Sequence, residues 1–353
     1  MLAKFLHSLR RKSASATYEH GFALAQAAYE RGDLVDAEAG FADLAAARPE
    51  LPQAWLYAGF CAFRQNNVPL ALARFVTARE LDPDNPEYSY QESVALAALG
   101  SIEAARVAAA RACELAPTLL PAHHYWARLE LPGDDYVAFM RRLHPFLKPA
   151  TYLEIGVFQG MSLALVAPGT EAIGVDPAPQ ILHPVSPHVV VEVMTSDDFF
   201  ASRGKHTLFG GRPLALGFID GMHRFEFALR DFINMERLCA SDSTILIHDC
   251  YPLNRATAGR EVTTSMFWSG DIWRLILILK KYRPDLQVNT LALAPTGLGM
   301  VRGLDPASSV LADRYDEIVA EFLAVDYDEL TADKPGTLNL FPNRWEAIVK
   351  LFD

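Results

Sequence analysis

The stretch Thr151–Gly160, TYLEIGVFQG, joins an apolar run to a turn that contains Gly156 and Gly160. The pattern predicts a buried strand at 151–155, a tight turn at Gly156, and close backbone approach at Gly160. A helix should follow, with its N-terminal N–H groups facing a ligand. Asp176 ends the next apolar run, AIGVD, about 20 residues after Gly156, where a carboxylate can accept hydrogen bonds from ribose hydroxyls. Together these features predict a site for a nucleotide-type cofactor.

Length and composition are those of a globular protein with two domains. The chain has 353 residues, of which 51% are hydrophobic and 21% are charged, enough for two separate cores. A net charge of −11 argues against nucleic acid as a partner, because phosphate backbones are bound by clustered Lys and Arg. The cysteines lack the C-x-x-C spacing of thiolate metal sites, which predicts a reducing, cytoplasmic location; they are Cys61, Cys113, Cys239 and Cys250.

The sequence contains no uninterrupted apolar run of about eighteen residues, so no transmembrane span is expected. Residues 1–16 open with MLAKFLHSLRRKS, which is basic and amphipathic but lacks the long apolar region and cleavage site of a signal peptide. We expect a basic N-terminal helix or tail there. A weak contact with a membrane surface is the alternative.

Residues 17–121 repeat with a period of about 34 residues, the period of tetratricopeptide repeats. Alanine recurs at positions 37, 71 and 105, and proline at 49, 83 and 117. In the middle copy the residues that match the tetratricopeptide pattern are Trp55, Gly59, Ala71, Phe75, Ala78 and Pro83. Small residues let two antiparallel helices approach, and aromatic residues fill the space between them. The sequence therefore predicts an α-solenoid of three helix pairs, followed by a capping or linker helix at 122–148.

Helical solenoids present extended concave surfaces to their partners. We therefore expect the repeats to bind a protein partner or to mediate self-association. A purely structural role is the alternative, and the sequence does not name the partner.

After Pro149 short apolar runs alternate with helical segments, which predicts a parallel α/β sheet over residues 149–303. The seven expected strands are 151–155, 171–175, 188–193, 213–219, 243–247, 286–294 and 297–301, with a turn at Pro295–Thr296 before the last. Residues 304–353 are expected to form a helical extension that includes an amphipathic helix at about 308–323.

Six motifs of the second domain occur in the order and spacing of a known bacterial family: TYLEIGVFQG, GVDP, TSDDFF, FIDGMHRFEFALRDF, ILIHDCYP and WSGDIW. The domain thus resembles methyltransferases related to macrocin-type sugar O-methyltransferases and cephalosporin-hydroxylase-like enzymes, over about 151–303. The resemblance implies a Rossmann-like class I fold and S-adenosylmethionine as cofactor. Strand spacing alone does not separate that cofactor from NAD. Phe158, however, stands where the dinucleotide fingerprint needs glycine beside a pyrophosphate.

The resemblance also distributes cofactor contacts over three strand exits. The first exit would hold the methionine moiety through Glu154, Gly156, Gly160 and Ser162, and Asp176 would bind the ribose. The adenine would lie beside Thr195, Ser196 and Asp197, after the third strand. The alternative for 196–198 is a plain helix N-cap.

Acids and imidazoles follow the fourth and fifth strands: Asp220 and His223, then His248 and Asp249. Adjacent parallel strands bring such residues to one edge of a sheet. In related sugar O-methyltransferases aspartates here bind a divalent metal, which implies Asp220 and Asp249 as ligands of Mg²⁺ or a similar cation. His223, His248 and Asp220 are the candidate catalytic residues, since an imidazole can remove the acceptor proton. The alternatives are a structural role for His248 and a helix-start role for His223.

The segment Trp268–Trp273 follows the fifth strand. It is either an aromatic cover for a substrate or a packing element. In the packing interpretation Asp271 caps a helix at 272–282. Trp273 is expected to pack in the core, and for Trp268 both interpretations stay open.

The first functional hypothesis is S-adenosylmethionine-dependent O-methylation of a sugar, a glycoconjugate precursor or another small hydroxylated acceptor. The transfer would be an in-line SN2 step accelerated mainly by proximity and orientation. The alternative is a non-catalytic scaffold that keeps a methyltransferase fold. An NAD-linked oxidoreductase is disfavoured by Phe158.

Overall fold

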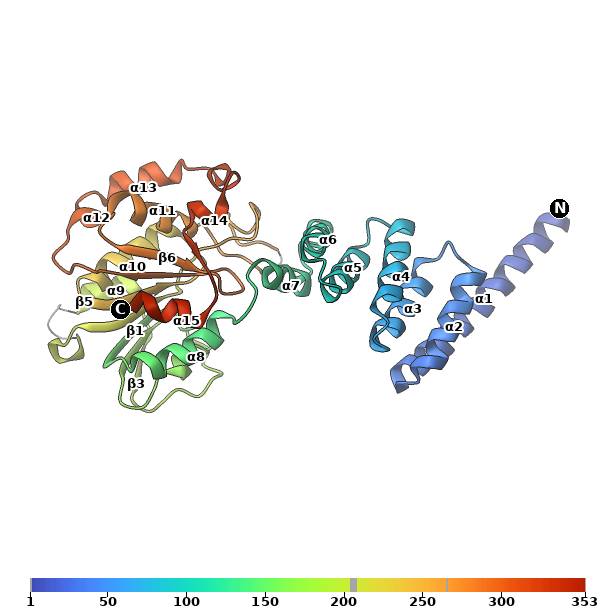
Figure 1. The fold of residues 1–353 in the computed structure, drawn as a ribbon, viewed down its shortest axis with the longest axis horizontal. Coiled ribbons are helices and arrows are strands. Elements are labelled where there is room, and N and C mark those ends of the chain that lie inside the picture. Colours follow the sequence, from blue (N-terminus) through green and yellow to red (C-terminus); the bar gives the residue numbers. More distant parts are fainter. Residues whose placement is uncertain (1, 204–207, 265, 353) are drawn as a thin grey trace. The chain divides into compact units, whose positions relative to one another are not determined.

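The computed structural model describes residues 2–203, 208–264 and 266–352, with side chains from residue 16 onward (Figure 1). The chain divides into two compact units, residues 1–129 and 130–353. None of the helices in the described ranges is long and apolar enough to cross a membrane. The side chains of the basic segment 1–16 lie almost entirely outside the described residues, so a membrane contact there stays a prediction.

The first unit is a series of antiparallel helix pairs. Its helices are α1 (Leu2–Arg31), α2 (Leu34–Ala47), α3 (Pro52–Arg64), α4 (Val68–Leu81), α5 (Pro86–Ala98), α6 (Ile102–Leu115) and α7 (Leu120–Glu130). The pairs α1–α2, α3–α4 and α5–α6 are the three predicted repeats. Local chemistry sets the helix starts, because the Asn67 and Asn85 side chains accept backbone N–H bonds at the first turns of α4 and α5. The predicted basic segment is continuous with the first repeat helix.

The repeat positions form the core between the helices. Ala37, Ala71 and Ala105 are fully buried, as are the rings of Phe41 and Phe75. These alanines therefore act as the predicted close-approach positions.

Gly59 is the most demanding position in this packing. A Cβ there would overlap Cε1 of Phe75 and lie 2.7 Å from its Cδ1. We predict that Gly59→Ala destabilises the first unit by roughly 1–3 kcal/mol, because overpacking outweighs the better helix propensity of alanine. Urea unfolding followed by circular dichroism measures the change.

The matched control is the double variant Gly59→Ala/Phe75→Leu, in which the shorter side chain leaves room for the new methyl group. The alanine substitution should then cost less than it does beside phenylalanine. A single variant as stable as the parent protein would disprove the packing argument.

The second unit contains one mixed sheet of eight strands, in the order β3-β2-β1-β4-β5-β7-β6-β8. The strands are β1 (Thr151–Ile155), β2 (Glu171–Val175), β3 (Val189–Glu192), β4 (Leu214–Ile219), β5 (Cys239–Ile247), β6 (Gln287–Leu291), β7 (Leu298–Arg302) and β8 (Leu340–Phe341). Neighbours among β1 to β5 pair in parallel, and β7 runs antiparallel to both β5 and β6. The seven predicted strands are present. The eighth, β8, was missed because it has two residues and lies in a segment interpreted as helical.

Helices cover both faces of this sheet (Figure 1). They are α8 (Tyr136–Leu147), α9 (Ser196–Ser202), α10 (Phe225–Glu236), α11 (Trp273–Tyr282), α12 (Val310–Asp313), α13 (Tyr315–Leu323), α14 (Lys334–Thr337) and α15 (Trp345–Ile348), with short 3₁₀ turns at Leu163–Leu165, Leu208–Gly211, Tyr327–Leu330 and Val349–Phe352. One core joins α10 and α11 to the sheet, and a second core joins α8 and α15 to it. The carboxyl edge of the parallel strands stays open between these layers.

Three helical predictions need correction. The segment 122–148 is not one capping helix: it contains α7 and α8, which fall in different units because α8 packs its apolar face into the second core. No α-helix follows β1, where the chain makes only the 3₁₀ turn Leu163–Leu165. The amphipathic helix expected at 308–323 is divided at Arg314 into α12 and α13.

His144 on α8 is a buried titratable group that no function needs. Its ring lies 5.0 Å from the ring of Tyr152, and in the described part of the chain neither ring nitrogen has a hydrogen-bond partner. Burial lowers the pKa of His144 from 6.5 to about 4. The folded chain thus holds this imidazole neutral.

We predict that His144 makes folding less stable in mild acid. Between pH 6.5 and about 4 only the unfolded chain takes up this proton, so stability falls as pH falls, by up to roughly 3 kcal/mol. Urea unfolding at several pH values would show a smaller loss for His144→Leu than for the parent protein. Parallel pH profiles for the two proteins would exclude this residue as the cause.

Candidate functional site

A cavity of about 780 Å³ opens at the carboxyl edge of the parallel strands. Its size is in the range of small-molecule sites. The predicted site residues on its wall are Gly156, Ser162, Asp176, Thr195, Ser196, Asp197, Asp220, His223 and His248. Glu154, Gly160 and Asp249 are not on that wall. The structure thus brings residues from five strand exits to one cavity.

Gly156 allows the chain that leaves β1 to lie against the chain that leaves β4. Its φ is +89°, and a Cβ there would overlap the carbonyl oxygen of Asp220. The backbone also bonds across this point, with Asp220 N donating to Ile155 O at 2.8 Å. The turn after β1 therefore fixes the distance between the glycine loop and Asp220.

Asp176 holds the glycine loop to the second strand exit. Its Oδ2 accepts hydrogen bonds from the backbone N–H groups of Val157 at 2.9 Å and Phe158 at 2.8 Å. Its Oδ1 accepts from Ala178 N at 2.7 Å. A carboxylate has about four acceptor positions, so one remains on Oδ1 for a ligand hydroxyl. The N–H groups of the glycine loop are thus engaged by this side chain, and the helix whose N-terminal N–H groups were expected to face a ligand is not formed.

Glu154 lies beneath the cavity and is completely buried. Tyr152 OH donates to it at 2.6 Å, and Ser162 Oγ donates to it at 2.7 Å. Burial raises the pKa of Glu154 to about 8, although these hydrogen bonds lower it. Glu154 was expected to contact the cofactor, but it does not line the cavity. It positions Ser162, which does.

Asp220, His223, His248 and Asp249 form one cluster at the exits of β4 and β5. His223 Nδ1 lies 3.0 Å from Asp249 Oδ2. His248 Nδ1 lies 3.1 Å from Asp220 Oδ1 and 3.3 Å from Asp249 Oδ2. Asp249 is buried, and its backbone adopts the left-handed conformation with φ +64°. Its Oδ1 accepts a hydrogen bond of 2.7 Å from Thr296 Oγ1. We call these four residues the acid–imidazole cluster.

Mutual electrostatics set the charge of this cluster. Burial disfavours the imidazolium of His223, but the Asp249 carboxylate outweighs burial and raises the pKa of His223 to about 9. Asp220 and Asp249 likewise raise the pKa of His248 well above its usual value against the effect of burial. The two imidazolium charges hold the pKa of Asp249 far below its usual range, although burial opposes this. Both aspartates thus favour the imidazolium form of the two histidines, which opposes their action as general bases in this arrangement.

The cluster also has the donor set of a metal site. Asp220, His223 and Asp249 each offer a ligand atom, and these atoms lie within 4.8 Å of one another. The ring nitrogens of His248 are buried and, among the described residues, make no hydrogen bond of good geometry. Mixed carboxylate and imidazole ligands suit Mn²⁺, Fe²⁺ or Zn²⁺ more than Mg²⁺, which prefers oxygen. The residues present therefore fit a divalent cation.

The cavity wall carries negative and apolar groups. Among its described residues are the carboxylates of Asp176, Asp197, Asp220 and Asp231, and no Lys or Arg. A pyrophosphate would meet these carboxylates and, among the described wall residues, no Lys or Arg, whereas a cationic ligand would be attracted.

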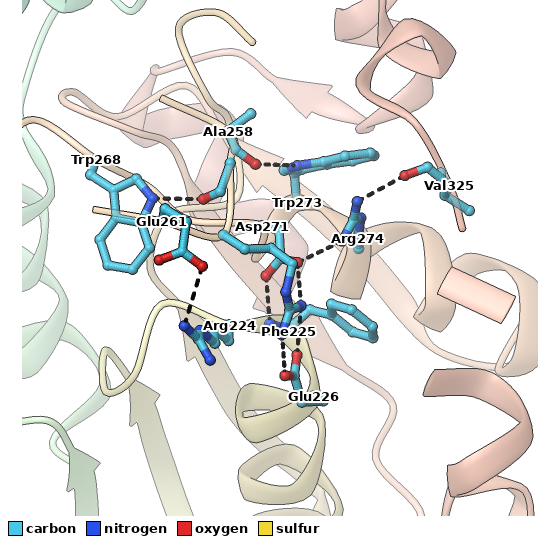
Figure 2. Close-up of polar contacts among 12 residues, drawn as sticks. Arg224, Phe225, Glu226, Ala258, Glu261, Trp268, Asp271, Trp273, Arg274 and Val325 are labelled. Atoms are coloured by element: carbon cyan, nitrogen blue, oxygen red, sulfur yellow. Dashed lines mark hydrogen bonds and ion pairs between the residues drawn. The ribbon is translucent and has the colours of Figure 1, made fainter. Parts of the chain in front are cut away.

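The segment after β5 forms one side of the cavity. Trp268 stacks on His223 with ring centroids 5.0 Å apart and planes 9° apart, and its Nε1 donates to Gly259 O (Figure 2). Trp273 is buried, as expected of a packing residue, and its Nε1 donates to Ala258 O. Trp268 therefore belongs to the site and Trp273 to the core.

Asp271 does not cap α11 as predicted. Its Oδ1 accepts from Phe225 N at 2.9 Å, at the first turn of α10. Its Oδ2 pairs with Arg260 at 2.7 Å and with Arg274 at 2.6 Å (Figure 2). Asp271 is fully buried. Its contact with Phe225 joins the segment after β5 to α10, the helix that follows His223.

Sequence reasoning missed two titratable residues among those described on the wall. Tyr136 lies at the start of α8, and its ring is 4.4 Å from the ring of His248. It was placed in the capping segment, so nothing linked it to the site. Asp231 on α10 also lines the cavity, although it lies in a quoted motif. An acid in the middle of an amphipathic helix is the only signal that could have found it.

Residues 153–250 match the family model of a methyltransferase domain. No curated protein matches the chain. The similar solved structures include the Yersinia enterocolitica type III secretion chaperone SycD with a peptide of the translocator YopD, which is 21% identical over 32% of this chain and 87% of its own at a TM-score of 0.30. The first TPR of Spaghetti (RPAP3), bound to an HSP90 peptide, is 19% identical over 33% and 90% at 0.31. MamA 41-end from Desulfovibrio magneticus RS-1 is 19% identical over 35% and 78% at 0.31. The chain thus carries helical repeats with the 34-residue period of tetratricopeptide repeats, followed by a domain that matches the methyltransferase family model.

Proposed function

We propose that the second unit is an S-adenosylmethionine-dependent methyltransferase that methylates a hydroxyl group of a small acceptor, such as a sugar. One observation carries the proposal: the glycine turn held by Asp176 and the acid–imidazole cluster face the same cavity. A donor bound across the first two strand exits would present its methyl group toward the next two. That layout suits in-line transfer.

The charge of the wall favours this donor over NAD. S-adenosylmethionine has a sulfonium cation and no phosphate, which matches a wall with carboxylates and, in its described part, no Lys or Arg. Phe158 adds a steric argument: its φ is +44°, and its side chain is 60% exposed at the turn where a pyrophosphate would need glycine.

The cluster would bind and orient the acceptor oxygen. Asp220, His223 and Asp249 would hold a divalent cation, with His248 beside them. When bound, such a cation lowers the pKa of a coordinated hydroxyl. Asp220 reaches the wall and would accept the hydroxyl proton in the absence of a cation. Asp249 is held away from the wall by Thr296 and both histidines, so besides offering a ligand oxygen to the cation it would position the two imidazoles.

The wall also limits which acceptor molecules fit the cavity. The exposed face of Trp268 suits the apolar face of a sugar ring, and the carboxylates would repel a phosphate group. A neutral sugar or glycoside therefore fits better than a nucleotide-activated or phosphorylated one.

For the repeats we propose a protein partner or a second copy of the chain. Leu24 and Val35 are exposed apolar residues on the first helix pair, and a groove between α1 and α2 is lined by Leu24, Ala28 and Leu44. The alternative for the whole chain is a scaffold without activity, which would not bind the cofactor.

The first test is cofactor binding by isothermal titration calorimetry. We predict that the protein binds S-adenosylhomocysteine and that Asp176→Ala weakens binding by roughly 10-fold or more, because a charge-assisted contact and the anchor of the loop are lost together. Asp316→Ala, which removes an exposed carboxylate on α13, is the control. Unchanged affinity in Asp176→Ala would remove the ribose assignment, and absence of binding to the parent protein would favour the scaffold.

The second test is cation binding, with Mn²⁺ as the probe and the electron paramagnetic resonance signal of free Mn²⁺ as the measurement. We predict that the protein depletes this signal and that Asp249→Asn restores most of it, since a ligand is lost from the cluster. Asp316→Asn should bind as the parent protein does. If the parent protein leaves the signal unchanged, the metal assignment is wrong and the acceptor proton would be removed without a metal.

A further inference from the structure

Asp231 is a buried acid, and one of its two carboxylate oxygens has no hydrogen-bond partner among the described residues. It lies on α10, is 3% exposed, and lines the cavity. Its Oδ1 is buried and has no hydrogen-bond partner among the described residues. The neighbouring Arg230 directs its hydrogen bonds elsewhere, to Asp197 at 2.7 Å and to Tyr315 OH at 2.9 Å. A buried acceptor of this kind calls for a donor from a ligand.

The position of Asp231 indicates which part of a ligand it would meet. Asp231 lies beside Ser196 and Asp197, at the start of α9 beyond β3, and all three line the cavity. Asp176 at the β2 exit and Asp220 at the β4 exit take the ribose and transfer ends in the proposed function. A nucleoside with its ribose at Asp176 therefore directs its base toward α9 and α10.

We propose that Asp231 accepts a hydrogen bond from the exocyclic amine of an adenine base and so selects an adenosyl donor. This inference rests on the proposed function. Adenine offers N–H at its 6-position, which a carboxylate accepts. Hypoxanthine offers a carbonyl oxygen there, whose lone pairs would oppose those of the carboxylate. A site built around one buried acceptor discriminates strongly against the analogue that lacks the donor.

The ionisation of the group agrees with this role. Burial raises the pKa of Asp231 to about 7, against a hydrogen bond from Ser196 that lowers it. An amine donor would stabilise the carboxylate, as hydrogen bonds to a charged form do.

The test compares S-adenosylhomocysteine with S-inosylhomocysteine, which has a carbonyl oxygen in place of the 6-amine and a proton on N1 of the base. By calorimetry we expect the parent protein to prefer the adenosyl compound by roughly 30-fold or more. In Asp231→Asn, which conserves shape, the amide can donate to the hypoxanthine oxygen, so the preference should fall to within roughly 3-fold. Asp316→Asn is the control, and circular dichroism checks the fold of each variant.

The two proposals fail in different ways. Equal affinity of the parent protein for both compounds overturns the role of Asp231, whether or not the variant folds. So does an unchanged preference in folded Asp231→Asn, while S-adenosylmethionine use stands. If the parent protein binds neither compound, the donor itself is wrong, and the role of Asp231 is overturned with it.

Discussion

The close approach of two strand ends, at Gly156 and Asp220, is the constraint on which the site depends. No other residue type fits at position 156, because a Cβ would overlap the carbonyl oxygen of Asp220. This contact puts the loop held by Asp176 directly beside the acid–imidazole cluster. Methyl transfer requires that proximity, since the reacting atoms must lie about 3–3.5 Å apart and in line. The main role of the tight turn is thus to set the distance between the loop and the cluster, and contact with the cofactor is its second role.

Buried charges then stabilise the wall around that contact. Asp249 joins Thr296, His223 and His248, which come from three separate segments. Asp271 does the same on the outer side, where it joins α10 to Arg260 and Arg274. Removing one partner of such a buried set leaves an uncompensated charge, which costs more than the set contributes when complete. Each cluster therefore specifies one arrangement of the chain segments it joins.

Strong periodic patterns made much of this fold predictable. The 34-residue repeat and the apolar runs located three helix pairs and seven strands, and the strand ends located the cluster. The predictions that failed depended on side-chain contacts that the sequence pattern does not reveal. Asp271 has the spacing of a helix cap, yet its carboxylate bonds Phe225, 46 residues away. Glu154 has a position that suggests a ligand, but Tyr152 and Ser162 hold it below the cavity. Tyr136 reaches the site only because α8 packs on the sheet.

The carboxylates of the cavity act both on the histidines and on any cationic ligand. The carboxylates raise the pKa of His223 and of His248, so the imidazoles are held as cations while nothing else is bound. A sulfonium donor or a divalent cation brings positive charge to the same carboxylates and competes with the imidazolium charges for them. Binding of either would therefore favour proton loss from a histidine. The acids of this cavity would thus hold the cationic ligands and also control when an imidazole can act as a base.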